Sequence, residues 1–574
     1  MSANLIVKAS SIITMNDAAP RAEAVAVDTA SGTITAIGSL ADVQAAAPGV
    51  AVTDLGSTVL MPGLIDPHNH PLLSGMATQS PSYWIAPSMG YATYADVQAL
   101  WKKIDAGLPA GQPVICNGLD RLLQGAPELT NTELDAFFPS RPALVLDNSG
   151  HEAYFNSAVI TLNGWAGNKP PPDPAGARFG RNADGTSNGR AYETAALLEA
   201  AGKMLTTAVP HPLLSLARWF TLMASNGVTM TTEHTYQSNM FKGYAACASL
   251  PEAPVRVGLY HMSIDATCGD PVTSPNPAKL WKQGIKLWAD GSPWVGTIAS
   301  SFAYLDTPVV QHAQIPLGPG GEAMMNYTRA QLDQILAKYA PMGWQMAFHV
   351  NGDVGLDIVL DAYEHALVTN NLLGSDHRWR VEHVGGCRGD QFDRAASLGV
   401  SISMLPAQFI YWGDLLDGQM FPTEIGSQWM RAGDAFRSGA LVTFHNDGSV
   451  SPPIPLLNIQ CMVTRRCLSG NLHGPEQQVS LNDAFKAHTI NAARQLKRDH
   501  DLGSLEVGKL ADFVELSADP FTVDSDKLTD QVKVLGTWVD GVKVNPDAFI
   551  AHVQAIDPSE HKDLPQAAVS SKCC

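Results

Sequence analysis

The sequence has few cysteines for its length, and none of them forms a C-x-x-C pair. Eight cysteines are scattered over 574 residues, whereas disulfide-stapled domains and Cys-rich zinc modules carry dense, regularly spaced cysteines. The pattern therefore excludes both classes and predicts reduced, buried thiols, as in a cytoplasmic protein. A vicinal pair, Cys573-Cys574, lies in the last residues, which we expect to be a mobile end without a role.

Long apolar runs and an excess of basic residues are also missing. No uninterrupted apolar stretch is long enough to span a bilayer, and MSANLIVKASSIITMN lacks the basic and apolar regions of a secretory signal. Lys and Arg total 37 against 55 Asp and Glu, which gives a formal net charge of −18. So acidic a chain is not expected to bind nucleic acid by neutralising phosphates. We expect a cytoplasmic protein with no membrane or nucleic-acid partner.

What is present is a composition typical of a large globular protein, with 45% hydrophobic and 16% charged residues. Short β-like runs punctuated by Gly and Asp fill residues 1–60, and the same texture returns at 500–550. Strand-rich ends around a long middle predict one small β-sandwich built from both chain ends. Residues 551–574 are expected to form a C-terminal tail.

The middle of the chain, 61–499, alternates short apolar strand candidates with helical stretches, which predicts βα units and a parallel sheet. A large insertion, about 75–225, follows the first candidate and contains a further strand-like run at 142–147, which leaves the count open by one. Without that run there are eight candidates, the number of strands in a closed (β/α)₈ TIM barrel: 58–66, 227–234, 254–261, 284–290, 344–350, 379–384, 400–405 and 440–446.

The most informative segment is TVLMPGLIDPHNH, an apolar run that ends in His68 and His70. Residues i and i+2 of an extended strand point to the same side, so both imidazoles project together. Two neutral imidazoles that converge on one point can begin a metal site. An isolated His-x-His pair is equally consistent with a polar turn, so the ends of the later strands decide between the two interpretations.

Reactive groups of (β/α)₈ barrels lie at the C-terminal ends of the strands. The later strand candidates IKLWADG, FHVNGD, VEHV and FHNDG carry Lys286, His349, His383 and Asp447. Imidazole and carboxylate suit Zn²⁺ and related divalent ions. Lys286 is the exception, because an ammonium repels a metal ion. A lysine that has reacted with CO₂ is an anionic carbamate able to bridge two metals; the alternative is a structural or substrate-binding cation.

These motifs, together with VEHVGG and the late GSLEVGKLADFVELSADP, resemble the metal-dependent amidohydrolase superfamily. They are most similar to its third amidohydrolase family, the branch that includes N-substituted formamide deformylase. The resemblance covers about residues 4–548 and is weakest in the insertion. It implies a (β/α)₈ barrel beside a small β-sandwich, and one or two metal ions. By resemblance, the first metal ion is bound by His68, His70 and Asp447. The second ion is bound by His349 and His383, and carbamylated Lys286 bridges the two ions.

The sequence departs from this family at His445-Asn446, where a small residue and Ser often precede the aspartate that corresponds to Asp447. His445 lies two residues before Asp447 on the same strand candidate, so its side chain is expected to point inward below the site. The departure can change the number of metal ions or the hydrogen bonds around their ligands.

The resemblance implies a metal-dependent hydrolase that cleaves a C–N bond, as in an amide or an N-acyl or N-formyl amine. A metal-bound water has a pKa lowered toward ~7, and the resulting hydroxide attacks the carbonyl carbon. Asp447 is the candidate general base and then general acid, and its alternative role is that of a metal ligand only. An ester, lactone or carbamate hydrolase and a heterocycle deaminase or ring-opening hydrolase remain alternatives. A non-catalytic scaffold is a remote one, because all six ligand positions are present.

Substrate selection is expected to rest on the barrel-top loops and the insertion. Aromatic residues after the fourth and seventh strands predict a pocket for a small substrate with an aromatic or bulky apolar group, although some of them only pack the loops: Trp288, Trp294, Tyr411 and Trp412. His151, in the insertion, is expected either to reach over the barrel mouth or to have no catalytic role. Asp353 stands where a helix begins, which predicts an N-cap. Homologous folds often form dimers, so a homodimer is a further expectation.

Overall fold

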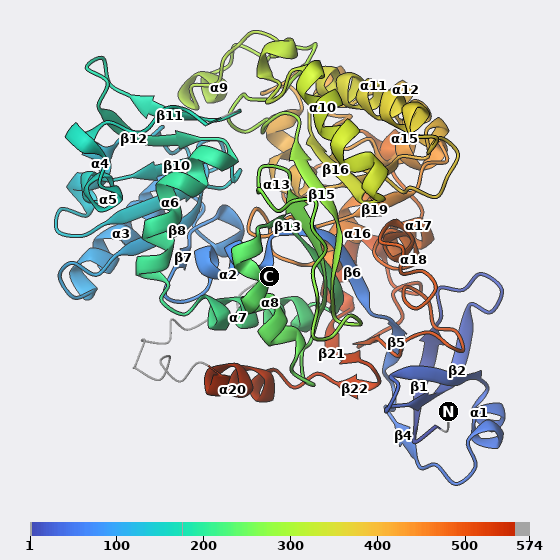
Figure 1. The fold of residues 1–574 in the computed structure, drawn as a ribbon. Helices are drawn as coiled ribbons and strands as arrows, with labels where there is room; N and C mark the ends of the chain where they lie inside the picture. The colour runs from blue at the N-terminus through green and yellow to red at the C-terminus, as the bar shows by residue number, and fades with distance from the viewer. Residues whose placement is uncertain (1–2, 175, 557–574) are drawn as a thin grey trace.

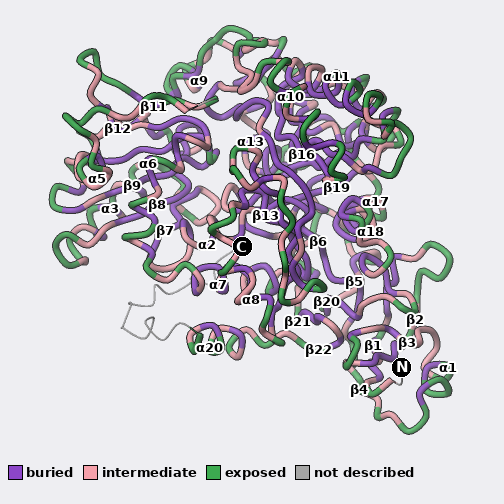
Figure 2. The backbone as a smooth tube through the Cα atoms, viewed as in Figure 1, coloured by how far each residue is buried: buried purple, intermediate pink, exposed green. Residues whose placement is uncertain are grey.

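The computed structural model describes residues 3–174 and 176–556. These residues form three sheets, one in each of three parts of the molecule: a central barrel, a sheet near the N-terminus and a sheet in the insertion (Figure 1). Buried residues are concentrated along the strands of the barrel (Figure 2). Among the described helices, none combines the length and apolar character needed to cross a membrane.

The central sheet contains eight parallel strands in the order β19-β18-β17-β16-β15-β14-β13-β6. Almost all of their residues are buried, as expected for a parallel sheet covered by helices. The backbone N–H of Asp447, just after β19, donates to the carbonyl of His68 on β6 at 3.2 Å, which brings the two ends of the sheet together. The predicted (β/α)₈ barrel is confirmed, and its strands correspond to the eight candidates: β6 (Leu64–Asn69), β13 (Val228–Tyr236), β14 (Arg256–Met262), β15 (Leu280–Trp288), β16 (Gln345–Val350), β17 (Arg380–His383), β18 (Ser401–Met404) and β19 (Val442–Phe444).

Helices follow the barrel strands and cover their outer side (Figure 1). The longest of them, α11, carries the run LDIVLDAY, whose apolar residues pack toward the barrel. The helices of this part are α7 (Pro212–Ser225), α8 (Phe241–Ala248), α9 (Pro308–His312), α10 (Arg329–Tyr339), α11 (Asp353–Thr369), α12 (Gly389–Ser397), α13 (Ala407–Leu416), α14 (Thr423–Gly426), α15 (Ala432–Arg437), α16 (Pro455–Thr464), α17 (Leu481–Ala487) and α18 (Ile490–Gln495).

The first predicted strand, 58–66, is two strands that belong to different sheets. Its first half, β5 (Val59–Pro62), pairs antiparallel with β20 (Phe513–Leu516), and only the second half enters the barrel as β6. Gly63 lies between them, where a Cβ atom would stand 2.2 Å from Thr229 Oγ1. The close approach of β13 therefore requires glycine at the point where the chain passes from one sheet to the other.

The pairing of β5 with β20 joins the two ends of the chain in one sheet, as predicted. Residues from both ends share its core, among them Ile12, Leu60, Phe513 and Trp538. The other strands and the two short helices of this part are β1 (Leu5–Ile13), β2 (Arg21–Asp28), β3 (Thr33–Gly38), β4 (Val52–Asp54), β21 (Val534–Val539), β22 (Val542–Lys543), α1 (Leu40–Ala46) and α19 (Leu528–Gln531).

The insertion forms a sheet of its own, in the order β11-β12-β10-β9-β8-β7. The strand-like run at 142–147 is β9 of this sheet, so it adds no strand to the barrel. The elements are α2 (Pro71–Thr78), β7 (Tyr83–Trp84), α3 (Tyr94–Gly107), β8 (Val114–Leu119), α4 (Asn131–Phe137), β9 (Ala143–Asp147), β10 (Glu152–Phe155), α5 (Ser157–Asn163), β11 (Arg178–Arg181), β12 (Ser187–Tyr192) and α6 (Thr194–Ala208).

The predicted tail, 551–574, begins inside a helix. Helix α20 (Pro546–Ile556) packs on α7, where Phe549 and Val553 are fully buried in an apolar cluster. Because Phe549 and Val553 lie four residues apart on one face of α20, the packed part of the chain extends past residue 551, where the tail was predicted to begin. Cys573-Cys574 lies outside the described residues.

Candidate metal centre

Three predicted ligands meet at the carboxyl ends of β6 and β19. Asp447 Oδ1 lies 3.1 Å from His70 Nε2 and 3.6 Å from His68 Nε2, and one ligand atom from each residue lies within 4.8 Å of the others. Asp447 Oδ1 is buried and makes no hydrogen bond, a state that costs a polar atom about 1–3 kcal/mol. A divalent cation would satisfy this oxygen and both imidazoles, so the three residues fit a metal ion.

His68 is held in a defined orientation by Glu382. Its Nδ1 lies 2.7 Å from Glu382 Oε2, so the N–H donates to the carboxylate and the lone pair of Nε2 faces the other ligands. Arg380 in turn binds Glu382 through two hydrogen bonds, and these side chains are fully buried. A carboxylate behind a metal-binding histidine fixes its tautomer and increases its basicity. Glu382 was not among the site residues predicted from the sequence, although it stands next to His383 at a strand end.

Lys286 points into the same cluster from β15. Its Nζ lies 3.1 Å from His68 Nε2, and burial lowers its pKa to about 7. A buried lysine with such a pKa is substantially uncharged near neutral pH, and the neutral amine is the form that reacts with CO₂. The position and protonation of Lys286 are therefore compatible with the predicted bridge.

His349 and His383 form the neighbouring pair, with ring centroids 4.4 Å apart. His349 Nε2 donates to the carbonyl of Gly291 at 3.0 Å, which leaves its Nδ1 for a metal. His383 Nδ1 lies 3.2 Å from His445 Nε2. Among the described residues, His349 joins no group of three His, Cys, Asp or Glu ligand atoms as compact as that of His68, His70 and Asp447, so the second predicted metal position is less compact than the first.

Burial sets the protonation of these histidines. It lowers the pKa of His68, His349 and His383 well below the usual value for histidine, so the three are neutral at physiological pH. Neutral imidazole is the metal-binding form of histidine. His70 differs: burial acts to lower its pKa, but the carboxylates of Asp447 and Glu233 outweigh burial and raise it.

Two residues of β13 complete the surroundings of the His-x-His pair. Glu233 Oε1 lies 3.7 Å from His70 Nδ1, and the carboxylate also accepts a 2.6 Å hydrogen bond from Thr235 Oγ1. His234 stacks on His68, with ring centroids 3.8 Å apart and an interplanar angle of 7°. Neither residue was among the predicted site residues. The sequence signal that could have identified Glu233 is a glutamate directly before a histidine at the end of a predicted barrel strand.

The insertion contributes His151 to the barrel mouth. The ring of His151 lies 5.0 Å from that of His349, and its Nδ1 lies 2.7 Å from Glu193 Oε2. Glu193 is the residue that precedes α6, so two elements of the insertion place this imidazole beside a predicted metal ligand. Sequence reasoning included His151 and missed Glu193.

The predicted aromatic pocket residues divide into two pairs. Trp294 and Trp412 stack on each other, with centroids 4.3 Å apart and an interplanar angle of 13°, and both are buried. Their rings therefore pack the loops against each other. Trp288 and Tyr411 remain partly exposed. Of the four, these two are the better placed to contact a substrate.

Asp290 and Asp353 organise the loops after β15 and β16. Asp290 accepts hydrogen bonds from the backbone N–H groups of Asn351, Gly352 and Ala299 at 2.8–3.1 Å. The prediction that Asp353 is an N-cap is wrong: Gly352 holds that position, and Asp353 is the first residue of α11. Its carboxylate instead binds the backbone N–H and hydroxyl of Ser301 at 2.8 and 2.6 Å.

A separate group of possible ligand atoms joins α13 to the loop before residue 473. His473 Nε2 lies 2.9 Å from Asp414 Oδ1, and its Nδ1 lies 2.7 Å from Asp417 Oδ2. Cys467 Sγ lies 3.3 Å from the same oxygen of Asp414. Because both nitrogens of His473 already have carboxylate partners, this group is a hydrogen-bonded network that fastens the loop to the helix.

The barrel and its cluster of histidines, lysine and aspartate define a metal-dependent hydrolase. The model of the amidohydrolase family matches residues 51–544, so the chain belongs to this family, as the motifs predicted. It is an enzyme that hydrolyses C–N bonds with the help of a metal.

Two relatives agree with this assignment, and one solved structure agrees with the fold. N-substituted formamide deformylase of Arthrobacter pascens is 25% identical over 540 residues, which cover 90% of this chain and 94% of that protein. The putative amidohydrolase YtcJ of Bacillus subtilis (strain 168) is 25% identical over 536 residues, 90% of this chain and 95% of that protein. A crystal structure of an uncharacterized metal-dependent hydrolase from Pyrococcus horikoshii OT3 matches with a TM-score of 0.69 and 21% identity, and covers 91% and 99% of the two chains. The last comparison concerns the fold alone.

Proposed function

We propose that the enzyme hydrolyses the amide bond of a small N-acyl or N-formyl amine that carries an aromatic or bulky apolar group. The observation that carries the proposal is the convergence of Asp447 Oδ1 on His70 Nε2 at 3.1 Å and on His68 Nε2 at 3.6 Å at the mouth of the barrel. The similarity to a formamide deformylase over most of both chains supports an N-formyl or N-acyl substrate.

The residues present fit one or two divalent ions, with Zn²⁺ the candidate. His68, His70 and Asp447 would hold the first ion, His349 and His383 the second, and Lys286 as a carbamate would lie between them. A bound divalent ion supplies a water of lowered pKa and a Lewis acid for the carbonyl oxygen. The mostly neutral imidazoles and the carboxylate supply the nitrogen and oxygen donors that such ions prefer.

Asp447 is the candidate proton carrier. Its carboxylate lies at the mouth of the barrel with Oδ1 on the side of His68 and His70, so the other carboxylate oxygen, Oδ2, would accept the proton of the attacking water. The same oxygen then returns the proton to the amide nitrogen, which leaves poorly as an anion. The transfer balances because the proton removed from water ends on the released amine, while the hydroxyl stays on the released acid.

His151 is the candidate substrate-binding residue from the insertion. Glu193 Oε2 accepts from its Nδ1 at 2.7 Å, which leaves Nε2 as the nitrogen available to a substrate. Because the His151 ring lies 5.0 Å from that of His349, a group bound to Nε2 is close to the metal ligands. Trp288 and Tyr411 would contact the apolar part of the substrate.

The experiment is a substrate panel measured together with metal content. The protein is stripped with a chelator, reloaded with Zn²⁺ or Mn²⁺ in bicarbonate, and tested on N-formyl, N-acetyl and N-aroyl amines and on aryl esters. We expect amine release that depends on the metal and that falls by about 10²–10⁴-fold in Asp447→Asn. His500→Asn, which changes an exposed histidine away from the strand ends, is the control and should retain full activity.

Faster cleavage of the esters than of every amide would replace the proposed substrate class with an ester or lactone. A protein that takes up no stoichiometric metal and releases no amine would contradict the proposed function as a whole.

A further inference from the structure

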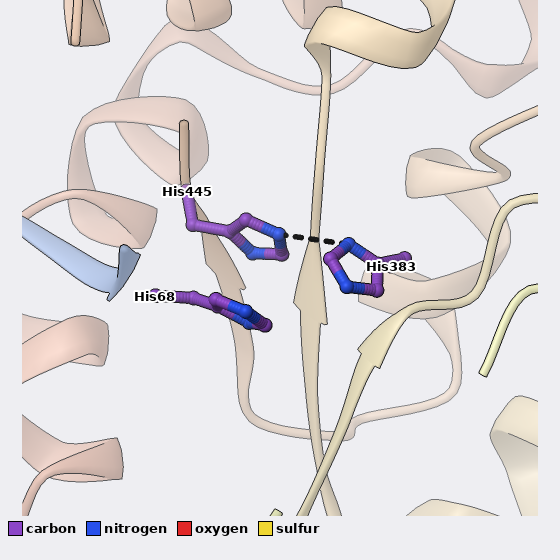
Figure 3. A group of neighbouring side chains, drawn as sticks. All are labelled: His68, His383 and His445. Atoms are coloured by element: carbon purple, nitrogen blue, oxygen red, sulfur yellow. Dashed lines mark hydrogen bonds between the residues drawn. The ribbon is translucent and has the colours of Figure 1, made fainter. Parts of the chain in front are cut away.

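His445 occupies a position in the barrel that the predicted ligand set does not use. It follows β19, two residues before Asp447, and its side chain is fully buried. Figure 3 shows its ring beside those of His68 and His383, with a hydrogen bond to His383. The His445 ring also stacks on that of His68, with centroids 4.6 Å apart and an interplanar angle of 22°.

Both ring nitrogens of His445 make hydrogen bonds. Nε2 lies 3.2 Å from Nδ1 of His383, and Nδ1 lies 2.8 Å from the hydroxyl oxygen of Ser403. Three adjacent strands thus supply one chain of hydrogen bonds, with Ser403 on β18, His445 after β19 and His383 on β17.

Only one arrangement of protons in this chain leaves His383 ready to bind a metal through Nε2. His383 must then carry its proton on Nδ1 and donate it to Nε2 of His445. His445 consequently carries its own proton on Nδ1 and donates it to the oxygen of Ser403. The geometry therefore selects the tautomer of two histidines at once, and the Ser403 oxygen ends the chain as the acceptor.

We propose that His445 is a positioning residue that fixes the tautomer and the ring orientation of His383 for metal binding. This inference rests on the proposed function, because it assumes that His383 is a ligand. Groups behind metal-binding histidines are usually carboxylates, carbonyls or water, and His68 follows this pattern through Glu382. His383 has a histidine partner instead. The imidazoles of His68 and His383 are therefore supported by groups of different charge.

The consequence is a difference between the two metal positions. The carboxylate of Glu382 increases the basicity of His68, whereas an imidazole acceptor gives His383 less electron density. The ion held by His383 should therefore leave first when metal is removed. This order of loss can be measured without any substrate.

The test compares His445→Phe with His445→Gln. Phenylalanine keeps the ring and removes both nitrogens, while the side-chain oxygen of glutamine can still accept the proton of His383 Nδ1. Zn²⁺ affinity is measured by competition with a chromophoric chelator, and circular dichroism and thermal unfolding establish that each variant is folded. We expect affinity about 10–100-fold lower in the Phe variant, as is typical for loss of such a partner, and largely restored in the Gln variant.

The outcomes separate the inference from the function on which it rests. Wild-type binding with an unchanged Phe variant would overturn the role of His445 alone, and so would an equal loss of affinity in folded Phe and Gln variants. A zinc-bound crystal structure with His445 Nε2 at about 2.0–2.1 Å from the ion would also overturn it, because His445 would then be a ligand. A wild-type protein that binds no zinc would contradict the proposed function together with the inference.

Discussion

Burial of Lys286 among the metal ligands imposes a cost on the metal-free protein. Its ammonium form is disfavoured there, which lowers its pKa to about 7 from the ordinary value of 10.5. Burial likewise keeps His68, His349 and His383 neutral. The centre thus presents mostly neutral nitrogen donors beside the carboxylate of Asp447, an arrangement suited to a cation that arrives later.

Replacement of this buried amine should stabilise the metal-free protein. Between pH 7 and 10.5 the unfolded chain binds the proton that folded Lys286 has released, so the amine destabilises the fold, and the destabilisation declines as pH rises toward 10.5. We expect metal-free Lys286→Met to gain on the order of a few kcal/mol in unfolding free energy at pH 7.5. The gain should shrink by pH 10.

Urea unfolding of metal-free protein at several pH values measures this difference. Lys102→Met on the exposed side of α3 is the matched control, with an expected change within about 0.5 kcal/mol. A Lys286→Met gain that does not shrink as pH rises toward 10 would show that the amine is not neutralised on folding.

The buried carboxylate of Glu382 should affect both metal binding and stability. In Glu382→Gln the negative charge that orients His68 is lost, and Arg380 keeps a buried charge without a counterion. We expect metal affinity to fall by about 10–100-fold and the unfolding free energy to fall by about 3–5 kcal/mol. Chelator competition and denaturant titration test the two effects separately, and metal affinity equal to wild type would contradict the role assigned to Glu382.

Individual ligands could be predicted from the sequence because a short motif places each one at the end of an apolar strand. His68, Lys286 and His349 are examples. Their supporting carboxylates could not be predicted, since Glu382 reaches His68 across 314 positions of sequence. Which nitrogen of a histidine faces the metal depends on such distant partners, so tautomers and orientations emerge only from the packed barrel.

The strands of the barrel were predictable for a related reason. Almost all of their residues are buried, and several, such as QMAFHV in β16, read as short, mainly apolar runs. In the insertion, strands such as RFGR in β11 and SNGRAY in β12 are short and polar, so periodicity gives little signal. The division at Gly63 was also missed, because β5 and β6 together form one unbroken apolar run.

The role of the insertion can be tested through Glu193, which orients His151. In Glu193→Gln the imidazole keeps a neutral partner but loses the charge that fixes Nδ1 as the donor. We expect KM to rise by roughly 10-fold, the equivalent of about 1.4 kcal/mol, with metal content unchanged. Steady-state kinetics on the best amide substrate and metal analysis test this expectation. Loss of metal in Glu193→Gln would show that the insertion supports metal binding and would contradict its role in substrate binding.

The molecule as a whole is tied together by a buried ion-pair network between the barrel and the terminal sheet. Arg256 on β14 binds both oxygens of Asp512 at 2.8 Å and also binds Asp540. Arg256 is fully buried, so its loss would leave the buried carboxylate of Asp512 without its counterion, whereas Asp540 would keep Lys279 Nζ at 3.8 Å. This network joins the C-terminal segment of the terminal sheet to the barrel.

We expect Arg256→Met to lower the unfolding free energy by about 3–5 kcal/mol. Lys8→Met, which breaks the exposed pair with Asp54, is the control and should cost about 0–1 kcal/mol. Denaturant unfolding of both variants measures the contrast, and equal effects would show that the buried network does not hold the two parts together.

The expected homodimer and the expected lack of a nucleic-acid partner remain predictions.

The central claim is that the ends of the barrel strands bind metal for C–N hydrolysis. A crystal of zinc-loaded protein, measured on both sides of the zinc absorption edge, tests it most directly. We predict an anomalous peak between His68 Nε2, His70 Nε2 and Asp447 Oδ1 at about 2.0–2.2 Å from each atom, and no such peak in Asp447→Asn crystals at low zinc. A zinc peak elsewhere, or none within the barrel of active protein, would contradict the account.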